Sequence, residues 1–181
     1  MTKPTPTPTP KPVFTSGSWQ GQITFTSGHN PISSILQLGT VQNGAFTGMM
    51  FGPGIGEGPS SGDVSGQDGA LNSFNPRAQN RLQQAINLGG NGTGVYVEFT
   101  ITSYGRIPII FPLNSVFDAV VFRDGSLRGV WFNPGDTQPD GTFIFTKGSQ
   151  GFISTDYTLS LMKAPALASS RDISMRNYAV S

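Results

Sequence analysis

The chain of 181 residues contains no cysteine and a single histidine, His29. The absence of cysteine excludes disulfide bonds, thiolate nucleophiles and zinc–thiolate sites. One histidine and scattered carboxylates give no cluster of metal ligands at a usable spacing, so we expect neither a metal nor a cofactor. A Ser-His-Asp triad would have to use His29, which lies in a predicted turn with no nucleophile motif nearby.

Charge is also scarce, since charged residues make up 12% of the chain, about half of the usual quarter. The formal charge is +1, and no basic cluster is interleaved with aromatic residues, so we expect no nucleic-acid partner. Long hydrophobic runs and an apolar N-terminal leader are absent too. We therefore expect no membrane span and a cytoplasmic location by default, with secretion after removal of a leader left open.

Glycine (24 residues) and proline (14 residues) are abundant instead, and 36% of the residues are hydrophobic. This composition favours turns and strands over helices, and a chain of this length can bury a core as one compact domain. We predict a Pro/Thr-rich extended tail at residues 1–14, a β domain at 15–164 and a C-terminal arm at 165–181. The tail alternates Thr or Lys with Pro, which favours polyproline II structure.

Alternation of apolar and polar residues predicts the strands. These strands span 17–26, 35–42, 45–51, 95–102, 116–123, 126–133, 142–147 and 157–163. The Gly-, Pro- and Ser-rich segment 52–70 is predicted as a loop with at most a short strand near Val64, and the apolar, Pro-interrupted segment 106–113 as an edge or bent connection. One helix is expected at 77–88, after the cap Asn75-Pro76, with a narrow apolar face.

About eight strands joined by tight turns favour an all-β fold, an antiparallel up-and-down β-barrel with one short helix. Closure leaves no strand edge exposed, and an interior of this size is either packed with side chains or holds one small ligand. A β-sandwich or jelly roll would give much the same pattern and is the alternative.

Two short turns set the predicted strand registers. Asn43-Gly44 predicts a two-residue type I′ turn that places Leu36 and Leu38 opposite Phe51 and Met49.

Asp124-Gly125 predicts a second turn of this kind. It places Asp118 opposite Trp131, on a face shared with Val120 and Phe122, and puts Arg128 on the other face. If that face points inward, burial would raise the pKa of the Asp118 carboxyl. If it points outward, Asp118 would accept hydrogen bonds from a neighbouring strand or turn.

Two short motifs carry a family resemblance. Gly17-Ser18-Trp19 resembles the Gly-x-Trp signature of the lipocalins and wider calycins, and Thr155-Asp156-Tyr157 matches the lipocalin Thr-Asp-Tyr motif. The resemblance implies an up-and-down barrel whose closed end is plugged by Trp19, with Arg171 packing on that tryptophan. It also implies an apolar cavity for a small hydrophobic ligand.

Two functions of different classes remain open. The first is a barrel that binds a small hydrophobic molecule in an internal cavity, with a cofactor-independent cyclase or isomerase as its catalytic variant. Its candidate catalytic or polar residues are Asp118, Tyr96 and Glu98, and its candidate ligand contacts are Trp19, Phe25, Met49, Phe99, Trp131 and Phe143. The second is a coat, sheath or fibre subunit that forms homo-oligomers through its terminal arms, which predicts a packed interior.

Overall fold

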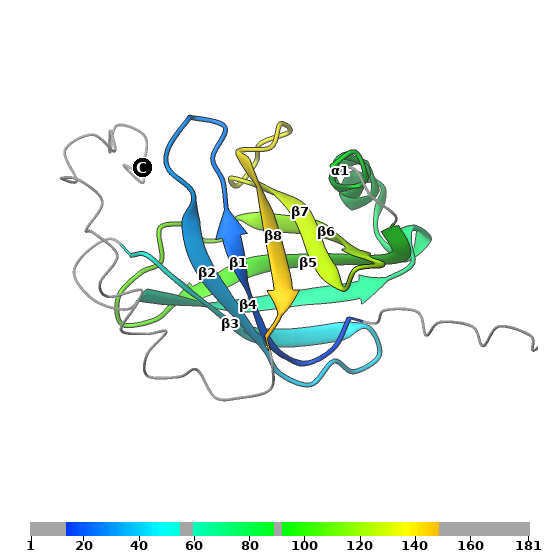
Figure 1. Ribbon diagram of the computed structural model, residues 1–181, viewed down its shortest axis with the longest axis horizontal. Helices are drawn as coiled ribbons and strands as arrows, with labels where there is room; N and C mark the ends of the chain where they lie inside the picture. Colours follow the sequence, from blue (N-terminus) through cyan, green and yellow to red (C-terminus); the bar gives the residue numbers. More distant parts are fainter. Residues whose placement is uncertain (1–13, 55–59, 89–91, 149–181) are drawn as a thin grey trace, which may run out of the picture.

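The computed structural model describes residues 14–54, 60–88 and 92–148. Eight antiparallel strands follow one another in chain order and close into a barrel, because β1 pairs with β8 as well as with β2 (Figure 1). The predicted all-β barrel is therefore confirmed, and the sandwich alternative is wrong. The strands are β1 (Gly17–Ile23), β2 (Ile32–Leu38), β3 (Ala45–Gly52), β4 (Ser60–Gly69), β5 (Gly92–Tyr104), β6 (Val116–Phe122), β7 (Ser126–Phe132) and β8 (Gly141–Lys147).

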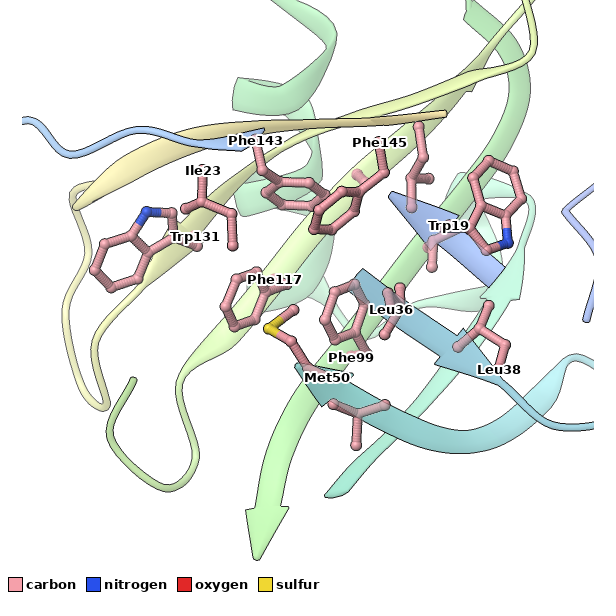
Figure 2. Packing of buried hydrophobic residues seen from close by; sticks show 14 of the residues in the cluster. Trp19, Ile23, Leu36, Leu38, Met50, Phe99, Phe117, Trp131, Phe143 and Phe145 are labelled. Carbon is pink, nitrogen blue, oxygen red and sulfur yellow. The ribbon is translucent and has the colours of Figure 1, made fainter. Parts of the chain in front are cut away.

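The barrel interior holds the main hydrophobic core. Alternate residues of each strand point inward, so the predicted apolar faces of β1, β5 and β8 all lie inside. Phe99 and Phe117 stack at the centre with ring centroids 4.9 Å apart. Figure 2 shows Trp19 and Trp131 at opposite ends of the row of interior side chains.

One end of the barrel, which we call the Trp19 end, is closed by the chain entering β1. Phe14 stacks on Trp19 at 5.4 Å and lies 5.2 Å from the ring of Phe46. The indole of Trp19 donates a hydrogen bond to the carbonyl of Thr15. Lys147, at the end of β8, lies 6.0 Å from the Trp19 ring centroid. Arg171, which the resemblance would pack on Trp19, lies outside the described residues.

Strand β4 is longer than the sequence predicted. It spans ten residues and pairs with both β3 and β5, whereas we expected a loop with at most a short strand. Its glycines have a packing reason: a side chain at Gly66 would overlap the ring of Phe46 and the Cβ of Phe99. The ladders on both sides thus outweigh the low β propensity of the segment.

The register predicted for the first hairpin is wrong by one residue. Asn43 and Gly44 do have positive φ angles of 51° and 78°, as a type I′ turn requires, and Gln42 bridges Ala45. Farther from the turn, however, Leu36 pairs with Met50 and Leu38 with Gly48. The pairing of β2 with β3 is therefore irregular between the turn and Leu38. As a result Met50, and not Met49, lies on the same face as Leu36 and Leu38.

The second hairpin has a three-residue loop instead of the predicted two-residue turn. The amide of Gly125 donates to the carbonyl of Phe122, and Gly125 alone in this loop has positive φ, which is the pattern of a type I turn with a bulge. Asp118 consequently pairs with Val130, and Trp131 pairs with Phe117. The predicted pairing of Asp118 with Trp131 is wrong, and the two residues lie on opposite faces.

Helix α1 (Pro76–Ile86) packs on the outside of β5, β6 and β7 (Figure 1), after a short 3-10 helix (Leu71–Ser73). Asn75 caps it, since its side chain accepts a hydrogen bond from the amide of Ala78. The predicted apolar face is confirmed: Ala78, Leu82 and Ala85 are buried against the sheet.

Several predictions fall on residues outside the described ranges. They include the strand at 157–163, the extended tail, the C-terminal arm and the Thr-Asp-Tyr motif. The eight described strands by themselves close the barrel. Among the described helices, none is long and apolar enough to cross a membrane.

Candidate functional site

The second end of the barrel, which we call the Phe111 end, is lined by small side chains on β2, β3 and β4. The inward positions there are Ser34, Gly52 and Gly62, and all three are buried. The space that they leave is filled by the connection between β5 and β6. The methyl Cδ1 of Ile109 lies 3.5 Å from the position that a Cβ on Gly52 would take, and its Cγ2 lies 3.3 Å from the corresponding position on Gly62.

Phe111, from the same connection, packs among the aromatic side chains at this end of the barrel. Its ring centroid lies 5.0 Å from that of Trp131, 5.2 Å from that of Phe117 and 6.3 Å from that of Phe25. Ile109 and Phe111 are 0% and 1% exposed, although they belong to a connection and not to a strand. We call these two side chains the plug.

The segment that carries the plug pairs with the chain on either side of residues 55–59, through the bridges Gly54 with Ile109 and Ser61 with Pro108. Ile110 donates to the carbonyl of Pro53, the amide of Ser61 donates to Ile107, and the Tyr104 hydroxyl donates to the carbonyl of Phe111.

A cluster of charged residues lies on the outer face of the barrel, beneath α1. Glu98 and Asp118 are neighbours on the paired strands β5 and β6, and Arg81 of α1 reaches both of them. Its Nε donates to Asp118 Oδ2 at 2.6 Å, and its Nη2 donates to Glu98 Oε2 at 2.5 Å. Two carboxylates thus share one guanidinium, and this bridge ties the helix to the sheet.

Burial dominates the electrostatics of this cluster. Asp118 is fully buried, and desolvation raises its pKa to about 8, although the Arg81 charge opposes the rise; the Glu98 carboxylate adds to it. Asp118 Oδ1 has no hydrogen-bond partner among the described residues. A protonated Asp118 leaves Arg81 and Glu98 as one neutral pair, so the cluster holds a proton at neutral pH. A substrate would reach Asp118 only after α1 moved.

The predicted site residues divide between the two faces of the wall. Trp19, Phe99, Trp131 and Phe143 lie in the interior core, and Phe25 packs against it. Tyr96, Glu98 and Asp118 lie together on the outer face near α1.

Two placements from the predicted registers are wrong. Met49 points outward and is 37% exposed, while its neighbour Met50 lies inside. Arg128 lies opposite Val120, on the same outer face as Asp118, and its partner is Asp124 instead.

Sequence reasoning missed Arg81, Ile109 and Phe111, and also Ser115, a fully buried residue whose carbonyl accepts a hydrogen bond from the amide of Ile101. Arg81 lies three residues after Ala78, and Leu82 lies four residues after Ala78. A helical wheel could therefore have placed Arg81 beside the apolar face of the helix. The plug residues lie in a Pro-interrupted segment that carries no periodic signal. Ser115 is recognisable only from the register of β5 with β6.

The chain has no match among protein-family models, and no curated protein matches its sequence.

Proposed function

We propose that the protein binds a small, predominantly apolar molecule at the Phe111 end of the barrel, in the space that the plug occupies. The proposal rests on which part of the chain supplies the large side chains that fill this end of the barrel. Strand residues at this end are serines and glycines, and a connection supplies the two large side chains that fill the gap. A closed eight-stranded antiparallel barrel is consistent with a calycin-like fold, which supports an interior ligand.

The energetics of exchange set the expected affinity. Moving an Ile or a Phe side chain into water costs about 1.5–3 kcal/mol each. A ligand of similar size regains that burial and also contacts the rings of Phe25, Phe117 and Trp131. We therefore expect dissociation constants in the range of about 10–1000 μM for simple hydrocarbons, because the plug competes with them.

The proposal covers binding and not a reaction. The candidate acids Asp118 and Glu98 lie on the outer face, so the barrel wall separates them from the plug. Among the described residues, the interior positions at the Phe111 end carry apolar, seryl or glycyl side chains. A cyclase or isomerase would need an acid or base that reaches the bound molecule.

The two tryptophans provide a test that reports position. In Trp19→Phe the remaining tryptophan lies beside the plug, and in Trp131→Phe it lies at the Trp19 end. We expect indane, a neutral bicyclic hydrocarbon, to change the fluorescence of Trp19→Phe saturably and to leave that of Trp131→Phe unchanged. Phe111→Ala should bind indane about tenfold more tightly, since the ring no longer competes.

Two results would contradict the proposal. If indane bound to Phe111→Ala but not to the unchanged chain, Phe111 would be an ordinary core residue and the substitution would have created the cavity. If indane changed only the fluorescence of Trp19, the binding site would lie at the other end.

The alternative, a subunit that associates with copies of itself, also has a supporting observation. None of the outward-facing side chains of β8, β1, β2 and β3 is charged, and Ile144 on this face is 51% exposed. We call this surface the uncharged face. It has no like charges to repel a second copy, which favours a two-fold interface.

Sedimentation velocity over a range of concentrations tests this second candidate. If the uncharged face forms an interface, Ile144→Lys should shift the protein toward monomer, because it buries a lysine in each copy. Leu88→Lys changes an exposed apolar residue at the end of α1 and should leave the association unchanged. A concentration-independent monomer would exclude self-association through this face.

A further inference from the structure

Ser115 has a buried hydroxyl without a hydrogen-bond partner. The residue is fully buried, and its Oγ finds no partner among the described residues. Its backbone is fully used, since its amide donates to Pro112 and its carbonyl accepts from Ile101. A buried hydroxyl that has given up water is unfavourable unless something replaces the lost hydrogen bond.

The backbone places this hydroxyl beside the plug region. Phe99 pairs with Phe117 and Thr100 with Val116, and one residue before β6 the carbonyl of Ser115 accepts a hydrogen bond from the amide of Ile101, while the amide of Asn114 donates to the carbonyl of Ile101. Ser115 has the same parity as the inward-facing Phe117, and its side chain therefore lies inside, next to Ile101.

Ile101 is itself in the plug region. Its Cγ2 approaches the position of a Cβ on Gly62 at 3.0 Å, and the Cγ2 of Ile109 approaches the same position at 3.3 Å. The Ser115 hydroxyl thus borders the space that the plug fills.

We propose that Ser115 Oγ is the polar contact for the bound molecule, and that the ligand is a neutral, mostly apolar compound carrying one carbonyl or hydroxyl oxygen. The inference rests on the proposed function. The plug side chains together contain about eleven carbon atoms, which sets the ligand at about ten non-hydrogen atoms. The interior side chains described at this end carry no charge, so an ionised carboxylate would be buried without a partner.

Three probes of one shape test this chemistry. Indane has no oxygen, 1-indanol adds one hydroxyl, and indane-1-carboxylate adds a charge. In the Trp19→Phe background, we expect 1-indanol to bind about five- to tenfold more tightly than indane, as one net hydrogen bond predicts. The carboxylate should bind more weakly than either. Ser115→Ala should remove the preference for 1-indanol and leave the affinity for indane unchanged, and Ser115→Cys should keep part of the preference.

Ser33→Ala is the matched control, because Ser33 lies on the outward face of β2 and is exposed; it should keep the full preference. Thermal unfolding without ligand gives an independent readout. Losing an unpartnered hydroxyl should leave the Tm of Ser115→Ala unchanged or raise it. A clear fall in Tm would show that the hydroxyl is already hydrogen-bonded in the free protein and would overturn the inference.

The binding results separate this inference from the proposed function. If indane and 1-indanol bind equally well, or if Ser115→Ala keeps the preference, the role of Ser115 is wrong while the binding site stands. If neither probe affects the fluorescence of Trp131, the site itself is wrong and the inference fails with it.

Discussion

Replacing Asp118 with asparagine should stabilise the protein at alkaline pH and have little effect at acid pH. The pKa of this carboxyl in the folded chain is about 8, against an ordinary value of 3.8, and burial is the main cause. The difference of about four pH units corresponds to about 6 kcal/mol at 1.36 kcal/mol per unit. This figure is the most that ionisation of Asp118 can cost the folded state.

The sign follows from proton binding. Between pH 3.8 and about 8 the folded chain holds a proton on Asp118 that the unfolded chain has released. Stability from this group is therefore complete below pH 3.8, falls as pH rises through that window, and is lost above pH 8. Asparagine has the same shape and does not titrate, so Asp118→Asn should escape this loss.

Urea unfolding at pH 5, 7 and 9 measures the effect. At pH 5 the folded wild-type chain is protonated at Asp118 but the unfolded chain is not, so the wild type has lost about 1.6 kcal/mol of this stability and Asp118→Asn should gain by about that amount relative to pH below 3.8. At pH 9 the ionisation cost is complete, so we expect Asp118→Asn to gain up to about 6 kcal/mol on the wild type relative to the difference below pH 3.8; the attraction between Asp118 and Arg81 is already included in the pKa of about 8.

The difference between the two proteins at each pH isolates Asp118 from other titrating groups. Asp136→Asn, in an exposed loop, serves as the control for removing one carboxylate from the surface. If Asp118→Asn were less stable than the wild type at pH 9, the ionised pair with Arg81 would outweigh burial, and the reasoning would be refuted.

Three further substitutions test the packing. Gly21→Ala should destabilise the protein by about 2–4 kcal/mol in urea unfolding, because its methyl would overlap the carbonyl of Ile144 where β1 and β8 close the barrel; a smaller loss would mean that this ladder shifts easily. Phe117→Ala should cost about 3–5 kcal/mol by the same assay, and a loss below 2 kcal/mol would show that the core collapses around the gap. Asn75→Ala should cost about 1 kcal/mol and speed amide exchange in α1, with the amide of Ala78 exposed first.

Local sequence patterns were sufficient to predict which residues of a strand share a face. Val97, Phe99 and Ile101 alternate with polar residues, and all three lie in the core. Strand β4 escaped prediction because its glycines and serines carry no apolar signal, and its order comes from the ladders on either side. The helix was recognisable because its cap, its proline and its apolar face lie within a few residues of one another.

The register of a strand pair depends on the length of the loop between the strands, which the residues of the turn alone do not determine. Asp124-Gly125 is compatible with both a two-residue and a three-residue loop, and the choice between them reverses the faces of β7 relative to those of β6. The three-residue loop places the apolar residues Val120 and Phe122 outward, where α1 covers them. Burial of that outer face against the helix is what makes this register consistent with the pattern.

The sequence by itself determined seven of the eight described strands, the helix and which residues within each of these strands share a face, because these follow from periodicities of two and of three to four residues. Only the tertiary structure decided that Arg81 bridges Asp118 and Glu98, and that Ile109 and Phe111 fill the space left by Ser34, Gly52 and Gly62. These contacts join residues far apart in the chain, and they depend on how the barrel closes. The candidate site consists of such contacts, and for this reason it could not be predicted from the sequence alone.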